Sequence, residues 1–318
     1  MTTLITGDLH LSENPRDSYR FRFLDWLVET VRNRSIDAVI ILGDLTDEKD
    51  RHSAWLVNEI CRYIHKLAKY AHVWALKGNH DYLIADNPFF QFLGRIDNIT
   101  WINEPIKFHP GSLFLPHTRQ HERDWGGFLN LRYEMIFCHN TFQGAMDNGH
   151  ELKGIPLSVF PKGSKIISGD IHTPQTIGPL TYVGAPYTIK FGDDYNGRVL
   201  LRDGSKITSL PYDGPQKRLF EISDTKGLKK LDVRKGDLIK LRINLKSDQY
   251  DDWPNIRQTI RDWADKNGYD LTLAPIMERK PREYRQIDIK SDEQLIRSFA
   301  KRTDISKLVL ASGLDFLK

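Results

Sequence analysis

Side chains that bind metal ions follow five separate apolar runs of this sequence. They are carboxylates, imidazoles and one carboxamide: Asp8 and His10, then Asp44, Asn79 and His139, and finally Asp170 and His172. This mixture of oxygen and nitrogen ligands suits Mn²⁺ or a similar divalent cation, and a carboxylate can bridge two such ions. The set contains no thiolate, which argues against a structural zinc site. The residue types therefore predict a site for two divalent metal ions.

The apolar runs before these residues predict strands that end where the polar side chains begin. The runs are Leu4–Thr6, Ala38–Leu42, Val73–Leu76, Met135–Cys138 and Lys165–Ile167. Helical periodicity separates the first three runs, around Phe23–Val31 and Leu56–Leu67. Alternating strands and helices predict a parallel sheet, and the carboxyl ends of its strands lie along one edge. We therefore expect the loops to bring the polar side chains together.

Glycine stands before four of these residues, namely Asp8, Asp44, Asn79 and Asp170. A chain that turns sharply off a strand toward an ion needs backbone freedom and close approach, which glycine provides. Taken singly, each motif also occurs as an ordinary turn, and a lone histidine such as His139 is more often a half-buried, hydrogen-bonded residue. The repetition of the pattern at successive strand ends is what indicates a metal site.

The rest of the chain predicts a second sheet and a smaller domain. Strand signals recur at Ser112–Leu115 and Thr181–Val183, and a hairpin turns at Asp203-Gly204. We expect an α/β fold in which a metal-binding β-sandwich of two packed sheets is flanked by helices, over residues 1–212. A small α+β domain is expected over residues 213–290, with a strand at 237–245, a helix at 254–266 and a strand at 271–276. C-terminal helices are expected over residues 291–318.

Composition is ordinary for a globular protein, with 318 residues, 40% hydrophobic residues and a net charge of +4. Cys61 and Cys138 lack metal-ligand spacing and are too few for a disulfide framework, which favours a reducing compartment. The N-terminal residues show no basic-then-apolar leader, and the chain has no apolar run long enough to span a membrane. We therefore expect a cytoplasmic protein.

The motifs, in this order, resemble those of the calcineurin-like metallophosphoesterases. The matching residues are Asp8-Leu-His10, Gly43-Asp-Leu-Thr-Asp47, Gly78-Asn-His-Asp81, His139 and Gly169-Asp-Ile-His172. Within that family the chain is similar to SbcD-type nuclease subunits of DNA double-strand-break repair complexes, especially phage-encoded versions, for which the compartment would be the host cytoplasm. The similarity also includes Ile171-His-Thr-Pro-Gln175, Tyr182-Val-Gly-Ala-Pro186 and Phe191-Gly-Asp193. The resemblance implies a metallophosphoesterase β-sandwich over residues 1–212 and a capping, DNA-binding α+β domain over residues 213–290.

The resemblance implies two metal ions, most simply Mn²⁺ with Mg²⁺ as an alternative, and a role for each motif residue. One ion would be held by Asp8, His10 and His172, the second by Asn79, His139 and Asp170, and Asp44 would bridge them. His80 would donate a proton to the leaving oxygen, and Asp47 would orient His80. The implied reaction is phosphodiester hydrolysis without a covalent intermediate.

Asp170 departs from the family, which usually has histidine at this position. Three interpretations compete: the aspartate ligates directly and favours harder ions such as Mn²⁺ or Mg²⁺, it binds through a water and weakens the second ion, or the site is degraded. Since the other motif positions are intact, we expect a working site with an altered metal preference.

The metal ligands do not select the substrate. The resemblance implies a DNA nuclease, an exonuclease with possible endonuclease activity, that acts in end processing, recombination or repair as a homodimer with an SbcC-type ATPase. Two alternatives are a phosphomonoesterase or cyclic-nucleotide phosphodiesterase of the same family, and a non-catalytic scaffold that binds DNA or a partner. A Ser/Thr protein phosphatase is disfavoured, because Asp81 replaces glutamate and no Asp-Arg-Gly follows Asp47.

Three groups of residues are compatible with nucleic-acid binding, and each is also compatible with an ordinary structural role. The first comprises basic clusters after residue 213: Lys217-Arg218, Lys229-Lys230, Arg234-Lys235 and Arg279 through Arg285. The second mixes arginine with aromatics around Tyr19–Arg22, where Phe21 would more commonly be core. The third is Arg119–Arg123 with Trp125. The apolar faces at 295–299 and 308–317 would contact the ATPase or pack on the chain itself.

Overall fold

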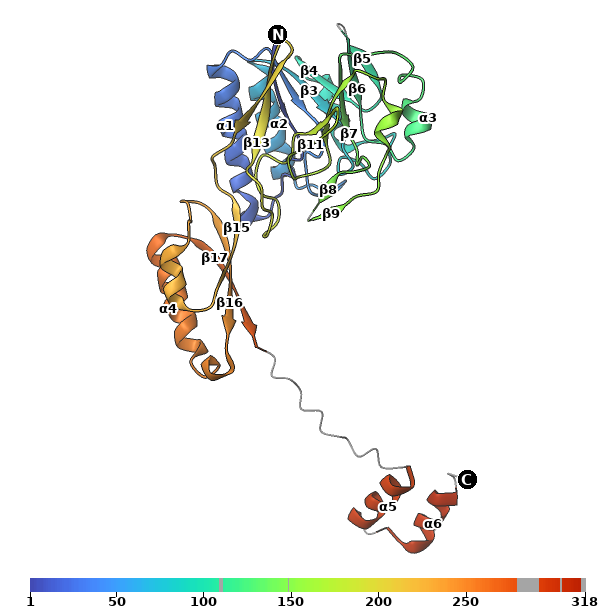
Figure 1. The fold of residues 1–318 in the computed structure, drawn as a ribbon, viewed down its shortest axis with the longest axis vertical. Coiled ribbons are helices and arrows are strands. Elements are labelled where there is room, and N and C mark those ends of the chain that lie inside the picture. Colours follow the sequence, from blue (N-terminus) through green and yellow to red (C-terminus); the bar gives the residue numbers. More distant parts are fainter. Residues whose placement is uncertain (109–110, 148, 279–291, 304, 316–318) are drawn as a thin grey trace. The chain divides into compact units, whose positions relative to one another are not determined.

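The computed structural model describes residues 1–108, 111–147, 149–278, 292–303 and 305–315. These residues form two compact units, Met1–Ile276 and Met277–Lys318. The first unit holds two six-stranded sheets, one three-stranded sheet and one two-stranded sheet, and the second holds two helices (Figure 1).

The first six-stranded sheet has the order β14-β13-β1-β2-β3-β4. Its strands are β1 (Thr2–Thr6), β2 (Ala38–Ile41), β3 (His72–Leu76), β4 (Ile99–Ile102), β13 (Arg198–Asp203) and β14 (Lys206–Pro211). Strands β1 to β4 are parallel, with Leu4 opposite Val39 and Val39 opposite Val73. The hairpin β13–β14 joins antiparallel to β1. The predicted parallel sheet is confirmed.

The second six-stranded sheet has the order β11-β12-β10-β7-β6-β5. Its strands are β5 (Ile106–Phe108), β6 (Ser112–Leu115), β7 (Met135–His139), β10 (Lys165–Gly169), β11 (Gln175–Ile177) and β12 (Leu180–Tyr182). The four central strands are parallel, and β5 and β11 pair antiparallel at the edges. In both sheets, the loops that carry the predicted metal ligands therefore follow the carboxyl ends of parallel strands.

The two sheets pack face to face on an apolar core. Side chains from both contribute to it: Ile5, Ile40, Leu42 and Leu76 from the first sheet, and Phe114, Phe137 and Ile167 from the second. The outer face of the first sheet packs against α1 (Tyr19–Asn33) and α2 (Ala54–Ala68), through a larger core that includes Phe23, Leu27, Ile60 and Ile64 (Figure 1). The predicted sandwich flanked by helices is confirmed.

The remaining elements of the first unit are short. They are α3 (His121–Trp125), the hairpin β8 (Met146–Asp147) and β9 (His150–Glu151), and the 3-10 helices η1 (Pro15–Asp17), η2 (Phe89–Arg95), η3 (Leu157–Val159), η4 (Thr225–Lys230) and η5 (Ser247–Gln249). Trp125 of α3 is fully buried beside Phe142 and Phe160. Its indole Nε1 donates to the Pro116 carbonyl at 3.2 Å, which anchors the loop after β6.

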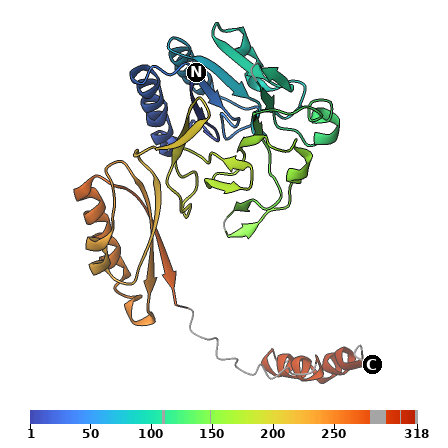
Figure 2. The same ribbon diagram turned by 45° about the horizontal axis from the view of Figure 1, so that its top comes forward.

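A three-stranded sheet completes the first unit, with the order β15-β16-β17. Its strands are β15 (Lys217–Ile222), β16 (Leu238–Leu245) and β17 (Asp270–Met277), and α4 (Trp253–Asn267) lies along one face (Figure 2). Helix α4 ends at Gly268, which adopts the left-handed conformation at φ 66° that closes a helix. The domain boundaries expected at residues 212 and 290 stay predictions.

The second unit contains α5 (Asp292–Arg302) and α6 (Lys307–Asp315). Leu295 is 51% exposed, Phe299 55% and Val309 59%. Among the residues that the structure describes, no helix is both long and apolar enough to cross a membrane.

Candidate metal centre

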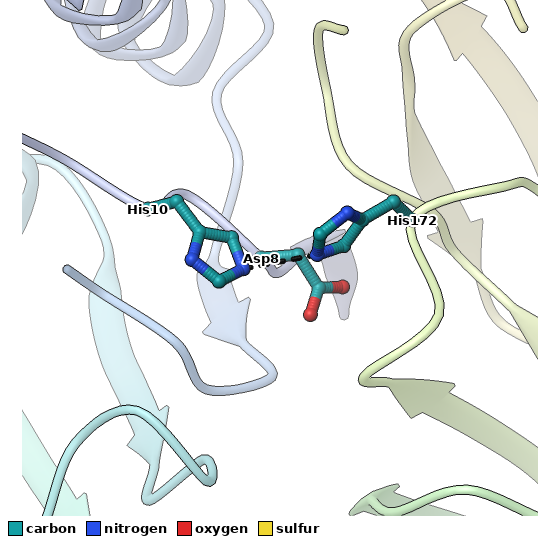
Figure 3. A group of neighbouring side chains, drawn as sticks. All are labelled: Asp8, His10 and His172. Atoms are coloured by element: carbon teal, nitrogen blue, oxygen red, sulfur yellow. Dashed lines mark hydrogen bonds between the residues drawn. The ribbon is translucent and has the colours of Figure 1, made fainter. Parts of the chain in front are cut away.

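The first predicted group of ligands comes together at the ends of β1 and β10. Imidazole Nε2 of His10 lies 3.0 Å from Nε2 of His172, and Figure 3 shows the two rings pointing at each other with the Asp8 carboxylate beside them. The ligand atoms of these three residues lie within 4.8 Å of one another. Asp8 and His10 are buried, and His172 is partly buried. The side chains thus converge on a space of the size that one cation needs.

The second group lies around Asp44, at the end of β2. His10 Nε2 is 3.5 Å from Asp44 Oδ2, and His139 Nε2 is 3.5 Å from Asp44 Oδ1. The Asn79 carboxamide lies 2.9 Å from His139 Nε2 and within 3.0 Å of both Asp44 carboxylate oxygens. Asp44 therefore stands between His10 on one side and His139 with Asn79 on the other, where a bridging carboxylate would stand.

The backbone is in the sparsely populated left-handed region at four of the predicted ligands. The φ angles are 54° at Asp8, 43° at His10, 54° at Asp44 and 89° at Asp170. Such strain persists only where the surrounding structure enforces it, and it gathers at functional sites. At Asp8 and Asp170 it is therefore the backbone of the ligand, and not that of the preceding glycine, that adopts the left-handed conformation.

Glycine matters most at Gly43 and Gly78, where two loops and a histidine meet. A Cβ added at Gly43, which has φ 97°, would lie 2.6 Å from His139 Nδ1 and 2.7 Å from the Gly78 Cα. A Cβ at Gly78 would overlap the Asp44 carboxylate. Close approach of backbones at this point is what lets Asp44 and His139 reach the same space.

The charges and hydrogen bonds of the predicted metal ligands fit the binding of divalent cations. Asp8 Oδ2 is buried and has no hydrogen-bond partner, although such an oxygen normally requires one. Burial raises the pKa of Asp8 to about 7, so a nearby positive charge is needed to keep it ionised at neutral pH. Burial alone would lower the pKa of His139, but the carboxylates of Asp44, Asp8 and Asp170 together outweigh it and raise that pKa to about 10. The site therefore favours positive charge among its carboxylates.

His139 presents the correct nitrogen to such a cation. Its Nδ1 hydrogen-bonds to the Leu42 carbonyl, so Nδ1–H is the donor and Nε2 faces Asp44 with its lone pair when the ring is neutral. A backbone carbonyl that fixes the tautomer of a histidine in this way is the usual companion of metal ligation.

Asp47 has a different contact from the one expected. The Asp47 carboxylate lies 3.0 Å from His10 Nδ1 and 2.7 Å from Arg20 Nη1, whereas His80 Nδ1 contacts the Asp47 backbone carbonyl at 2.6 Å. The expectation that the Asp47 side chain orients His80 is corrected: the main chain of Asp47 holds His80, and its side chain orients His10. The His80 amide also donates to Asp44 Oδ1 at 2.8 Å.

Two buried charges that support the site were not assigned roles from the sequence. The Asp81 carboxylate is fully buried and accepts the backbone N–H groups of Asp44 at 2.9 Å, Leu45 at 3.0 Å and Gly78 at 2.7 Å. It therefore joins the loops after β2 and β3. Arg20 is 2% exposed and donates to the His10 carbonyl, which holds the loop after β1. The sequence signal for Asp81 was its place in the Gly-Asn-His-Asp motif.

Asp170 lies at the margin of the cluster. Its carboxylate accepts a hydrogen bond from the Thr141 hydroxyl and stands 3.8 Å from His139 Nε2, and its amide donates to Asp8 Oδ1 at 2.9 Å. Asp170 belongs to none of the described groups of carboxylate and imidazole atoms that lie within 4.8 Å of one another. All three interpretations of this residue, as a direct ligand, as a ligand through a water and as the mark of a degraded site, remain predictions.

Three of the basic residues proposed for nucleic-acid contact form ion pairs. Lys217 Nζ lies 2.8 Å from Asp17 Oδ1, Arg218 Nε lies 3.4 Å from Asp237 Oδ2, and Arg234 pairs with Asp213. Phe21 is core, and Arg20 is buried, so neither faces solvent. The cluster from Arg279 to Arg285 lies outside the described residues.

Arg119 is different, because it lines two cavities beside the cluster. One, of about 410 Å³, is also lined by Asn79 and Asp170, and the other, of about 490 Å³, by Lys77 and Trp125. Arg119, Gln120 and Arg123 line the larger of these cavities, and a role of this loop in nucleic-acid contact stays a prediction.

Comparison with known proteins gives a family match over most of this region. The calcineurin-like phosphoesterase family matches residues 1–201. The chain is 35% identical over 88 residues to the SbcD subunit of the nuclease SbcCD from Escherichia coli strain K12 and, equally, from Escherichia coli O157:H7. That match covers 26% of this chain and spans about a fifth of the length of these relatives (21%). A crystal structure of the Pseudomonas putida nuclease MPE matches with 14% identity and a TM-score of 0.30, over 65% of this chain and 87% of that one.

Proposed function

The chain belongs to the calcineurin-like phosphoesterase family, and from this premise we propose that it is a metal-dependent nuclease that hydrolyses phosphodiester bonds in DNA. The observation that carries the proposal is the convergence of Asp8, His10, Asp44, His139 and His172 at strand ends of two packed sheets. The similarity to a nuclease subunit over 88 residues supports DNA as the substrate class.

Two Mn²⁺ ions are the proposed cofactors, with Mg²⁺ as the alternative. Asp8, His10 and His172 would hold one ion, Asn79 and His139 the other, and Asp44 would contact both. Asp170 would join the second ion directly or through a water. Bound ions would supply Lewis acidity and neutralise the negative charge that develops on the phosphate.

His80 is the proposed general acid. Its Nδ1 is fixed on the Asp47 carbonyl, so a protonated ring keeps Nε2–H for the leaving oxygen. The ring also packs edge-on against His10, with ring centroids 4.8 Å apart. His80 therefore lies next to the metal ligands, and in this proposal it is not itself a ligand. Asp44 Oδ1 accepts the His80 amide hydrogen, so the proposed bridging carboxylate is linked directly to the residue that carries the acid.

The biological role is proposed from the partial similarity to the SbcCD nuclease. We place the protein in DNA end processing, recombination or repair, as an exonuclease with possible endonuclease activity. It would act as a homodimer with an SbcC-type ATPase, and the exposed apolar residues Leu295 and Phe299 of α5 are the proposed contact. The two free cysteines suit a reducing cytoplasm.

A substrate panel tests the proposal against its alternatives. The purified chain, with Mn²⁺, is assayed on linear duplex DNA, bis-p-nitrophenyl phosphate, p-nitrophenyl phosphate and a cyclic nucleotide, each with and without ATP. Hydrolysis of DNA and of the diester supports a nuclease. Hydrolysis of the monoester or the cyclic nucleotide without cleavage of DNA would identify the other phosphoesterase classes, and no hydrolysis at all would identify a scaffold.

A further inference from the structure

A series of ion-pair contacts connects the three-stranded sheet to the metal centre. It begins at Lys217, the first residue of β15, whose Nζ lies 2.8 Å from Asp17 Oδ1 in η1. Arg20 Nη2 lies 3.2 Å from the same Asp17 oxygen, and Arg20 Nη1 lies 2.7 Å from Asp47 Oδ2. Asp47 Oδ1 in turn lies 3.0 Å from Nδ1 of the proposed metal ligand His10. Side chains therefore link β15 to a ligand of the first metal ion without interruption.

The linking residues, which we call the Lys217 network, are balanced in charge and mostly shielded from water. The side chains of Lys217, Asp17 and Arg20 are 13%, 7% and 2% exposed. Two cations alternate with two carboxylates, so both carboxylates share Arg20. Ion pairs that are removed from water are weakly screened, and the loss of one partner leaves a buried charge uncompensated. Without the charge of Lys217, Asp17 would therefore compete more strongly with Asp47 for the guanidinium of Arg20.

The inner end of the network holds both the main chain and the ring of His10. Arg20 donates to the His10 carbonyl, and Asp47 lies next to the ring nitrogen Nδ1. The His10 backbone is left-handed, with φ 43°, a conformation that persists only where surrounding contacts enforce it. Loss of a carboxylate that orients a ligating imidazole typically weakens metal binding about 10–100-fold. A displacement of Arg20 would therefore change the direction in which His10 presents Nε2.

Strand β15 also has attachments that do not involve the Lys217 side chain. The Lys217 amide donates to Thr188 Oγ1 at 2.6 Å, and the Thr188 amide donates to Gln216 Oε1 at 2.7 Å. Thr188 lies between β12 and β13, so these bonds hold the start of β15 to the rest of the first unit. A substitution of the Lys217 side chain should therefore break the network and leave β15 attached.

We propose that Lys217 is a positioning residue for His10, acting through Asp17, Arg20 and Asp47, so that the contact between β15 and η1 sets the affinity of the metal centre for its cation. The inference rests on the proposed metal site. It assigns to the three-stranded sheet a role in shaping a centre to which the sheet contributes no ligand.

Mn²⁺ binding measured by calorimetry tests this role, with Arg218→Met as a matched control for Lys217→Met. Arg218 is the next residue of β15 and lies 3.4 Å from Asp237, so its substitution removes the same charge outside the network. The loss of a nearby positive charge by itself favours a bound cation, so weaker binding cannot come from the charge alone. We expect Lys217→Met to raise the half-saturating Mn²⁺ concentration about threefold to tenfold. Arg218→Met should bind at least as tightly as the wild type, and Lys217→Arg should recover most of the affinity.

The ring resonances of His10 report the network in the absence of any metal. Histidine ring signals are recorded by NMR in a chelator, and those of His10 are identified by their loss in His10→Gln. They should shift in Lys217→Met and stay in place in Arg218→Met. A merely structural role of Lys217 would lower the urea midpoint without moving these signals selectively.

The outcomes separate the positioning role from the metal site on which it rests. Equal Mn²⁺ affinities for Lys217→Met and Arg218→Met, unmoved His10 signals in Lys217→Met, or no recovery in Lys217→Arg would overturn the proposal. A wild type that binds no Mn²⁺, with His10 signals that still respond to Lys217→Met, would overturn the metal site and keep the positioning of His10. Lys217→Gln, which keeps a donor for Asp17 without the charge, replaces Lys217→Met if that variant does not fold, and it should act in the same direction.

Discussion

Replacing Arg20 by methionine tests whether a buried cation holds the ligand loop in place. Its guanidinium is almost fully buried and connects three groups: the His10 carbonyl, Asp47 Oδ2 at 2.7 Å and Asp17 Oδ1 at 3.2 Å. Methionine keeps an unbranched apolar side chain and removes the guanidinium with its charge. The substitution therefore leaves two carboxylates and a carbonyl without this partner.

The expected cost follows from the burial of those groups. Removing one partner of a buried ion pair typically destabilises a protein by about 3–5 kcal/mol. The Asp47 side chain is 35% exposed, so water compensates for part of its lost ion pair with Arg20. Asp17 still has an ion-pair partner, because Lys217 lies 2.8 Å away. We therefore expect the lower end, about 3 kcal/mol, with a fall in Tm of about 6 °C or more.

Urea unfolding followed by circular dichroism measures this cost, with Arg16→Met as a matched control. Arg16 pairs with Asp270 at 3.6 Å, but the two side chains are 53% and 51% exposed. Such a surface pair contributes less than about 1 kcal/mol, so the control should unfold near the wild-type midpoint. Equal midpoints for Arg20→Met and Arg16→Met would refute the role assigned to Arg20.

Three further substitutions test individual residues of the site. His80→Ala should lower kcat about a hundredfold while Mn²⁺ binding, measured by calorimetry, is retained; near-normal turnover would remove His80 as the general acid. Asp81→Asn replaces one of two carboxylate acceptors by a donor, so the free energy of unfolding should fall by about 2 kcal/mol in urea, and an unchanged value would contradict its bracing role. Asp170→His should alter the preference between Mn²⁺ and other divalent ions in a nuclease assay, whereas an inactive wild type revived by histidine would show that Asp170 disables the site.

The positions of the candidate ligands were predictable because they depend on simple features of the chain. Ala38–Ile41 is a short apolar run, so it forms a strand, and the polar residue after it falls at the carboxyl edge of a parallel sheet. The same argument placed His139 near Asp44 and His172 near Asp8 and His10, although they are distant in sequence. Short strands such as Ile106–Phe108 were missed because three residues carry too little pattern.

Contacts between particular side-chain atoms could not be predicted from the order of residues in the sequence. The Asp47 side chain turned to His10 and Arg20, and only the backbone of Asp47 reached His80. Arg20 lies in an aromatic segment that was compatible with binding of phosphate, but in the folded protein the Arg20 side chain is buried. Left-handed conformations at Asp8 and Asp170 arise from tertiary constraint, which local sequence does not encode.

Cleavage of end-labelled duplex DNA tests the central claim most directly. Wild type and Asp44→Asn are incubated with the labelled duplex in Mn²⁺ and, separately, in a chelator, and the products are resolved on a denaturing gel. Shortened fragments should appear only for the wild type in Mn²⁺, because Asp44 lies between the two proposed metal positions. Intact DNA with active hydrolysis of bis-p-nitrophenyl phosphate, or equal cleavage by Asp44→Asn, would contradict a metal-dependent DNA nuclease at this site.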